Sequence, residues 1–169
     1  MDAKVFLQKQ IEIQRALADA VIGGVTEEQA NAASPGTCNT IATILLHVAG
    51  TDDAFLHVRA QAKPLLWESG NWAARVGFPM PPGRAGFWAE ANAATLPLAP
   101  ILEYQAAMRA ALDAYVAAAT DDDLARTMPS PFGEQPLYGI LGLMVVHSSS
   151  HFGEIAALKG AQGLKGLPF

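Results

Sequence analysis

Two histidines four residues apart, His147 and His151, are the side chains whose type and spacing best suit metal chemistry. Apolar residues and these histidines occupy positions 140, 144, 147, 151, 155 and 158, which share one face of a helix. Side chains at this spacing lie close enough to hold one ion, and an unpaired imidazole in an apolar core is costly. The pair therefore needs a partner, and a metal ion is the strongest candidate.

Two further histidines, His47 and His57, lie in a predicted helix that begins near Thr40. Helical-wheel counting at about 100° per residue places His47 at the edge of that helix's apolar stripe, where it can face a neighbouring helix. His57 lies on a different face and is the weakest candidate ligand. With His147 and His151, His47 would make a three-nitrogen site that suits Zn, Ni, Cu or Fe. Such a site leaves one position open for water or substrate.

A simpler interpretation of the same histidines stays open. The four-residue spacing alone is a weak indication, and buried imidazoles are often satisfied by a backbone carbonyl or a hydroxyl. The serines at 148–150 are available for such hydrogen bonds.

Acidic residues near the histidines add candidates. Glu154 lies three residues after His151, on nearly the same helix face. We single it out as a candidate catalytic residue, a general base; it could also bind the metal, orient an imidazole or remain a solvated charge. Asp52 and Asp53 follow His47 by one turn and more. They could also orient an imidazole, but for these two we expect solvation on the helix surface.

The bulk composition predicts one well-packed domain over residues 1–169, because 51% of them are hydrophobic and only 16% are charged. A net charge of −5, with the arginines scattered, offers no basic patch for nucleic acid. The single cysteine, Cys38, excludes an intrachain disulfide. The chain shows neither a signal-peptide pattern nor a membrane-spanning run of about 20 apolar residues. We therefore expect a cytoplasmic protein.

Hydrophobic periodicity predicts four helices, at about 3–21, from 39 or 40 to Pro64, at about 98–119 and at about 137–159. Between the second and third, segment 64–96 is irregular, rich in proline and glycine, and holds all three tryptophans. A connection of roughly 30 residues can cross the length of a bundle. We therefore expect an all-α four-helix bundle whose second and third helices run parallel, with no strong strand pattern.

The aromatic residues of segment 64–96 suggest that it packs over a substrate pocket. Trp72, Arg75 and Arg84 are the candidate substrate-binding residues, since an arginine can pair with a substrate carboxylate. Packing is the competing role for the tryptophan, and solvation is the competing role for the arginines.

Three segments, in order, resemble the DinB/YfiT-like superfamily: NTIATILLHVAGTDDAFL, LLWESGNWAARVGFP and HSSSHFGEIAALKGAQGLKGLPF. The resemblance runs from about residue 36 to the end. It implies a DinB-like bundle with the parallel arrangement, a homodimer, and a divalent ion, zinc or nickel, held by His47, His147 and His151. Glu154 stands where many relatives carry glutamine, which leaves the coordination open.

The better understood members of that superfamily resemble metal-dependent thiol transferases and isomerases that use small thiols such as bacillithiol or mycothiol. The resemblance therefore implies a thiol-dependent S-transferase or isomerase with a small-molecule substrate. An imidazole-bound cation with an open position can lower the pKa of a thiol and hold it as thiolate. A metal-dependent hydrolase and a non-catalytic metal- or ligand-binding stress-response protein are the alternatives. The apolar tail GLKGLPF could pack across a partner or fold back on its own bundle.

Overall fold

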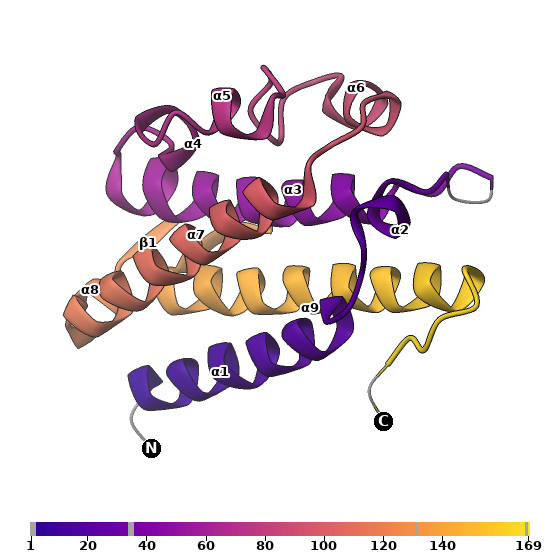
Figure 1. The fold of residues 1–169 in the computed structure, drawn as a ribbon. Coiled ribbons are helices and arrows are strands. Elements are labelled where there is room, and N and C mark those ends of the chain that lie inside the picture. The colour runs from indigo at the N-terminus through magenta and orange to yellow at the C-terminus, as the bar shows by residue number, and fades with distance from the viewer. Residues whose placement is uncertain (1–2, 34–35, 131, 168) are drawn as a thin grey trace.

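Four long helices dominate the computed structural model, which describes residues 3–33, 36–130, 132–167 and 169 (Figure 1). They are α1 (Ala3–Ile22), α3 (Ile41–Asp53) continued by the π-helix η1 (Ala54–Arg59), α7 (Leu98–Ala118) and α9 (Leu137–Ala161). Short helices lie in the connections: α2 (Glu27–Asn31), α4 (Leu66–Ser69), α5 (Trp72–Val76), α6 (Phe87–Ala93) and α8 (Asp121–Ala125). The predicted mostly helical fold is confirmed, and segment 64–96 contains the short helices α4, α5 and α6.

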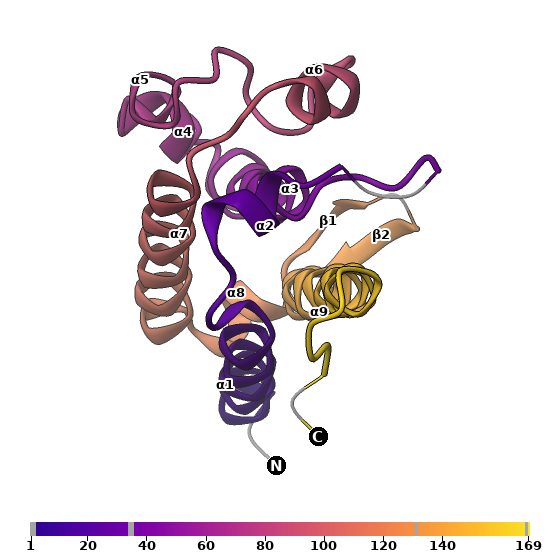
Figure 2. The same ribbon diagram turned by 45° about the vertical axis from the view of Figure 1, so that its right-hand side comes forward.

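Helix α3 is the inner helix of the fold. It packs against both α7 and α9, and α9 packs in turn against α1 (Figure 2). Ten of its residues are buried, so it is apolar on nearly every side. The window Ile41–Arg59 is long and apolar enough for a membrane span, but 61% of it is buried inside the protein, as in the core helix of a soluble protein.

The N-terminus of α3 also holds α6 in place. The Thr40 side chain caps α3 by accepting a hydrogen bond from Thr43 N at 3.2 Å. Thr40 N donates in turn to Asn92 Oδ1 at 2.9 Å. Further along α3, a Cβ atom on Gly50 would lie 1.9 Å from Pro82 Cβ, so only glycine allows this close approach. The part of segment 64–96 that leads into α6 therefore lies directly on α3.

A buried carboxylate, Asp53, fastens the other end of segment 64–96. It is 0% exposed and accepts hydrogen bonds from Leu66 N and Trp67 N, both at 2.8 Å. Tyr104 Oη donates to it at 2.6 Å, and His57 Nδ1 lies 2.7 Å away. One carboxylate thus joins η1, α4 and α7 to the end of α3. Our expectation that Asp53 is solvated was wrong, because helical periodicity does not show that α4 crosses above this position.

A short hairpin precedes α9. Strands β1 (Thr127–Ser130) and β2 (Gly133–Pro136) pair antiparallel, with Thr127 opposite Pro136. The sequence did not predict these strands, since four residues with a proline in each are too few for alternation to be recognised.

The C-terminal tail folds back on α9. A Cβ atom on Gly166 would lie 2.5 Å from the carbonyl oxygen of Ala156. Of the two predicted positions for the tail, packing on its own helix is the one that the described residues adopt.

Asp53→Asn should lower the free energy of unfolding by about 2–4 kcal/mol, because its amide leaves at least one buried donor without an acceptor. Urea denaturation followed by circular dichroism measures this loss. The matched control is Asp121→Asn, an exposed carboxylate in the first turn of α8, which should cost about 0.5 kcal/mol. A loss of unfolding free energy in Asp53→Asn no larger than in the control would show that the hydrogen bonds to Asp53 contribute little to the fold.

Candidate metal centre

The structure brings together the three histidines singled out from the sequence. His47 lies on α3, and His147 and His151 lie one turn apart on α9, where these helices pack. The Nε2 atoms of His47 and His147 are 3.2 Å apart, and one ring nitrogen of each histidine lies within 4.8 Å of the other two. Two zinc–nitrogen bonds at a tetrahedral angle span about 3.4 Å, so this separation fits a shared ion.

Burial keeps two of these imidazoles in the form that binds a metal. Burial, assisted by the neighbouring His151, lowers the pKa of both His47 and His147 to about 4. Both rings are therefore neutral at pH 7 and offer a lone pair.

The serines at 148–150 do not satisfy the imidazoles. Ser149 and Ser150 donate to backbone carbonyls one turn earlier in α9, at 2.8 and 2.9 Å. Ser148 forms a hydrogen bond with Asp52. Within the described part of the chain, the buried Nδ1 atoms of His47 and His147 have no hydrogen-bond partner. Their Nε2 atoms face each other. The Thr51 hydroxyl lies 3.5 Å from His47 Nε2 but leaves both Nδ1 atoms unsatisfied, so the arrangement favours a shared ion over a polar core satisfied by hydroxyls.

Glu154 lies beside His151. Its Oε2 atom is 2.9 Å from His151 Nδ1, and its side chain is 37% exposed. A hydrogen bond there places the proton on Nδ1 and leaves the Nε2 lone pair for an ion. Of the roles considered for Glu154, this geometry matches that of an acceptor that orients an imidazole.

Aromatic residues at the start of α6 cover the histidines. The Trp88 ring lies 4.4 Å from the His47 ring and 6.4 Å from the His151 ring, and the buried Phe87 ring lies 6.3 Å from His47. From the sequence we expected segment 64–96 to cover the site, but we did not single out Trp88. The available signal in the sequence was Gly86, a glycine directly before the two aromatic residues. It allows the left-handed φ of 87° in the turn before α6.

Of the three candidate substrate-binding residues, Trp72 and Arg75 contact each other. Trp72 is buried against Tyr104, with ring centroids 5.2 Å apart. The Arg75 guanidinium lies 3.6 Å over the Trp72 ring and pairs with Glu103 of α7. Arg84 is exposed in the turn that leads into α6. Only Arg84 thus belongs to the part of the segment next to the aromatic cover.

Comparison with known proteins identifies the family. The sequence profile of the DinB superfamily matches residues 10–155, so the chain belongs to this superfamily, as its motifs indicated. The crystal structure of a conserved protein from Enterococcus faecalis is similar, with a TM-score of 0.77 over 94% of this chain and 96% of that one. Its sequence identity is 15%, so this likeness concerns the fold alone. Among curated proteins, no sequence matches the chain.

Acid should destabilise the metal-free protein through His47 and His147. Their pKa is about 4 in the folded state and 6.5 in the unfolded state, so between these values the unfolded state binds more protons. Their contribution to stability is therefore complete above pH 6.5 and is lost as the pH falls towards 4. Allowing for partial exposure, the free energy of unfolding should fall by about 1–2 kcal/mol for each histidine over this pH range.

Urea denaturation at about pH 7 and about pH 4.5 measures this loss. His147→Gln removes one of the two groups, so its stability should fall less with acid than that of the wild type. Equal losses in the two proteins would contradict the lowered pKa of His147.

Proposed function

We propose that the three histidines hold a divalent transition ion, zinc or nickel, and that the protein is a thiol-dependent S-transferase or isomerase acting on a small molecule. The observation that carries the proposal is the pair of facing Nε2 atoms of His47 and His147, 3.2 Å apart, whose rings have no partner at Nδ1 among the described residues. Imidazole nitrogens suit zinc and nickel, and three protein ligands leave a position for an exchangeable ligand.

Each residue of the site has a distinct task in this proposal. When bound, the ion would lower the pKa of a thiol cosubstrate and hold it as thiolate. His47 and His147 supply neutral nitrogens, and Glu154 fixes the tautomer of His151. The indole of Trp88 excludes water from one side of His47 and offers an apolar wall to an electrophilic substrate.

The position of the only cysteine supports a thiol from solution. Cys38 is exposed and lies nine residues before His47. Most of that distance is helical, so the two residues are separated by about 13 Å along the chain axis. A thiolate at the ion would therefore come from a cosubstrate and not from the protein.

The tests below also distinguish two alternatives to the S-transferase or isomerase. In a metal-dependent hydrolase a general base would activate water, and Glu154, bonded to His151, is poorly placed to act as one. In a non-catalytic metal- or ligand-binding stress-response protein, the ion would not exchange its fourth ligand with a thiol.

We also infer that the four long helices form a four-helix bundle in which α3 and α7 run parallel. The path of the chain in Figure 1 supports this, since segment 64–96 returns along α3 before α7 begins. A homodimer and a cytoplasmic location are further proposals, and they rest on the family resemblance and on the composition.

Purified wild-type protein should contain about one equivalent of zinc or nickel, and His147→Ala should lose it, because two nitrogens hold an ion more weakly than three. Mass spectrometry of the metal content is the measurement. His57→Gln is the matched control: His57 lies against Asp53, outside the group of three, so its loss should leave the metal in place. A wild-type protein that stays empty after incubation with several divalent ions would end the metal proposal.

Cobalt separates the thiol-dependent enzyme from its alternatives. When cobalt-loaded protein is titrated with small thiols, a thiolate on the ion should produce a charge-transfer absorption band, and His147→Ala should not show it. If cobalt binds but no thiol produces the band, the S-transferase proposal fails while the metal site stands. Hydrolase assays then become the next test.

Glu154→Ala should weaken metal affinity about 10–100-fold, because His151 loses the acceptor that fixes its ring. Glu154→Gln keeps an oxygen that can accept the same hydrogen bond, so its loss should stay below about 10-fold. Competition with a chromophoric chelator measures both affinities. Equal losses in the two variants would indicate that the carboxylate charge itself matters, as in direct coordination.

A further inference from the structure

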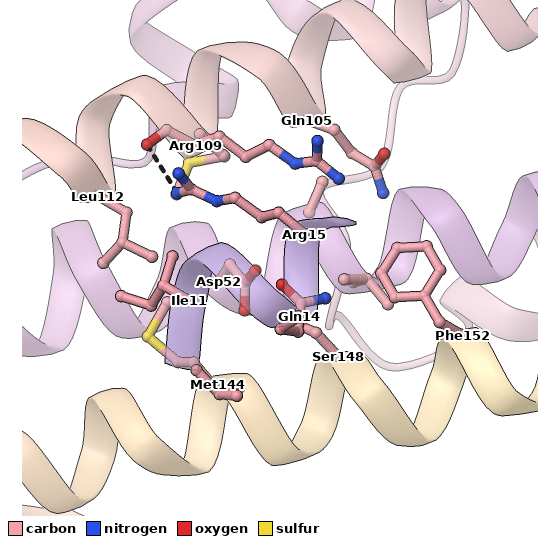
Figure 3. A pocket seen from close by; sticks show the side chains of 14 residues that line it. Ile11, Gln14, Arg15, Asp52, Gln105, Arg109, Leu112, Met144, Ser148 and Phe152 are labelled. Carbon is pink, nitrogen blue, oxygen red and sulfur yellow. Dashed lines mark hydrogen bonds between the residues drawn. The ribbon is translucent and has the colours of Figure 1, made fainter. Parts of the chain in front are cut away.

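A second polar site lies inside the fold, away from the aromatic cover of the histidines. It is a cavity of about 40 Å³ bounded by α1, α3, α7 and α9 (Figure 3). Arg15, Arg109, Asp52 and Ser148 line it together with apolar side chains such as Met144. A volume of this size holds about three water molecules. The mixture of charged groups and an apolar wall is unusual for a simple packing defect.

Two arginines form the outer wall of the cavity. Arg15 of α1 reaches α7, where it pairs with the Asp113 carboxylate at 2.7 Å and donates to the carbonyl of Arg109 at 3.0 Å. Arg109 reaches back to Asp19 of α1 at 2.6 Å. These crossed ion pairs fix both guanidiniums between the two helices. Each guanidinium has five N–H groups, so donors remain for a ligand.

Asp52 lies on the inner side. Figure 3 places its carboxyl between Arg15 and Ser148. Its Oδ1 atom is buried and has no hydrogen-bond partner among the described residues, and it forms no ion pair with either arginine. A buried carboxyl oxygen without a partner is costly, so the cavity needs an occupant. Our expectation that Asp52 is solvated on the helix surface was wrong.

We propose that this cavity binds a small carboxylate of the size of formate or acetate, held between the two guanidiniums and the carboxyl of Asp52. The planar fork of an arginine matches a carboxylate. In its neutral form, the Asp52 carboxyl donates a hydrogen bond to the second ligand oxygen. The wall that includes Met108 and Met144 suits the methyl group of acetate better than a further water. The volume excludes larger acids.

Binding is coupled to one proton. The ligand brings a negative charge next to Asp52, so the complex forms with this carboxyl neutral, and an ionised Asp52 takes its proton from solvent. Burial already raises the pKa of Asp52 to about 7, against the opposing effects of Arg15, Ser148 and Arg109. The charged and titratable groups around it are Arg15 and Asp19 from α1, Arg109, Asp113 and Tyr104 from α7, and Asp53 from α3; α9 contributes the hydroxyl of Ser148.

The test uses the full chain, freed of metal with a chelator and then dialysed, so that the histidines cannot capture a carboxylate through an ion. Isotope-labelled acetate is titrated and its binding followed by NMR. We expect saturable binding at about pH 6 and about 10-fold weaker binding at about pH 8, because one proton is taken up. In Asp52→Asn, the amide N–H replaces the acid proton, so affinity should be equal at both pH values. Benzoate should not bind.

Matched variants locate the acetate. Arg15→Gln should weaken binding at least 10-fold, because a charge-assisted hydrogen bond is lost. Lys9→Gln removes a cation of the same helix, from an exposed pair with Glu12, and should change nothing. Circular dichroism checks that each variant is folded. The proposal is overturned if folded wild type binds neither acetate nor formate at about pH 6, leaving water as the occupant. Binding that survives Arg15→Gln, or that stays pH-dependent in Asp52→Asn, also overturns it.

Discussion

The buried carboxylate of Asp53 determines where segment 64–96 lies, and with it what covers the histidines. A carboxylate taken out of water must be met by donors, and this one is met by two backbone N–H groups of α4, by Tyr104 and by His57. These contacts fix the start of segment 64–96 at the C-terminal end of α3. The hydrogen bond from Thr40 N to Asn92 fixes α6, near the end of the segment, at the N-terminus of α3. Trp88 lies between these two fixed points in the chain, and its ring contacts His47.

Helix α3 carries three polar side chains that each meet a different environment. His47 faces α9 and α6, Asp52 faces the cavity, and Asp53 faces α4 and α7. At about 100° per residue, Asp52 lies about 140° from His47, and Asp53 a further 100° round. Because α3 is buried on nearly every side, Asp53 cannot turn to water, and His47 and Asp52 are half-buried. Each therefore specifies what packs against its side of the helix.

The sequence predicted the features that follow from helical periodicity. The four long helices and the shared position of His47, His147 and His151 depend on spacing within regular elements, and these agree with the structure. The contact of Trp88 with His47 depends on the path of an irregular segment, which no periodicity describes. The roles of Asp52 and Asp53 were missed for a related reason: their partners lie on elements far away in the sequence. Local pattern shows that a residue is polar, but not what will cover it.

The two polar sites meet at the contact between α3 and α9. An ion shared by the three histidines would join these helices on one side, and the hydrogen bond of Ser148 to Asp52 joins them on an adjacent side. His147 and Ser148 are neighbours in the chain, so their side chains leave α9 about 100° apart. An ion that binds only the folded protein adds its binding free energy to stability. Burial of the imidazoles weakens the metal-free protein in acid, but with an ion bound they would strengthen the contact between α3 and α9. Such a gain would explain why costly polar groups lie in the most apolar part of the fold.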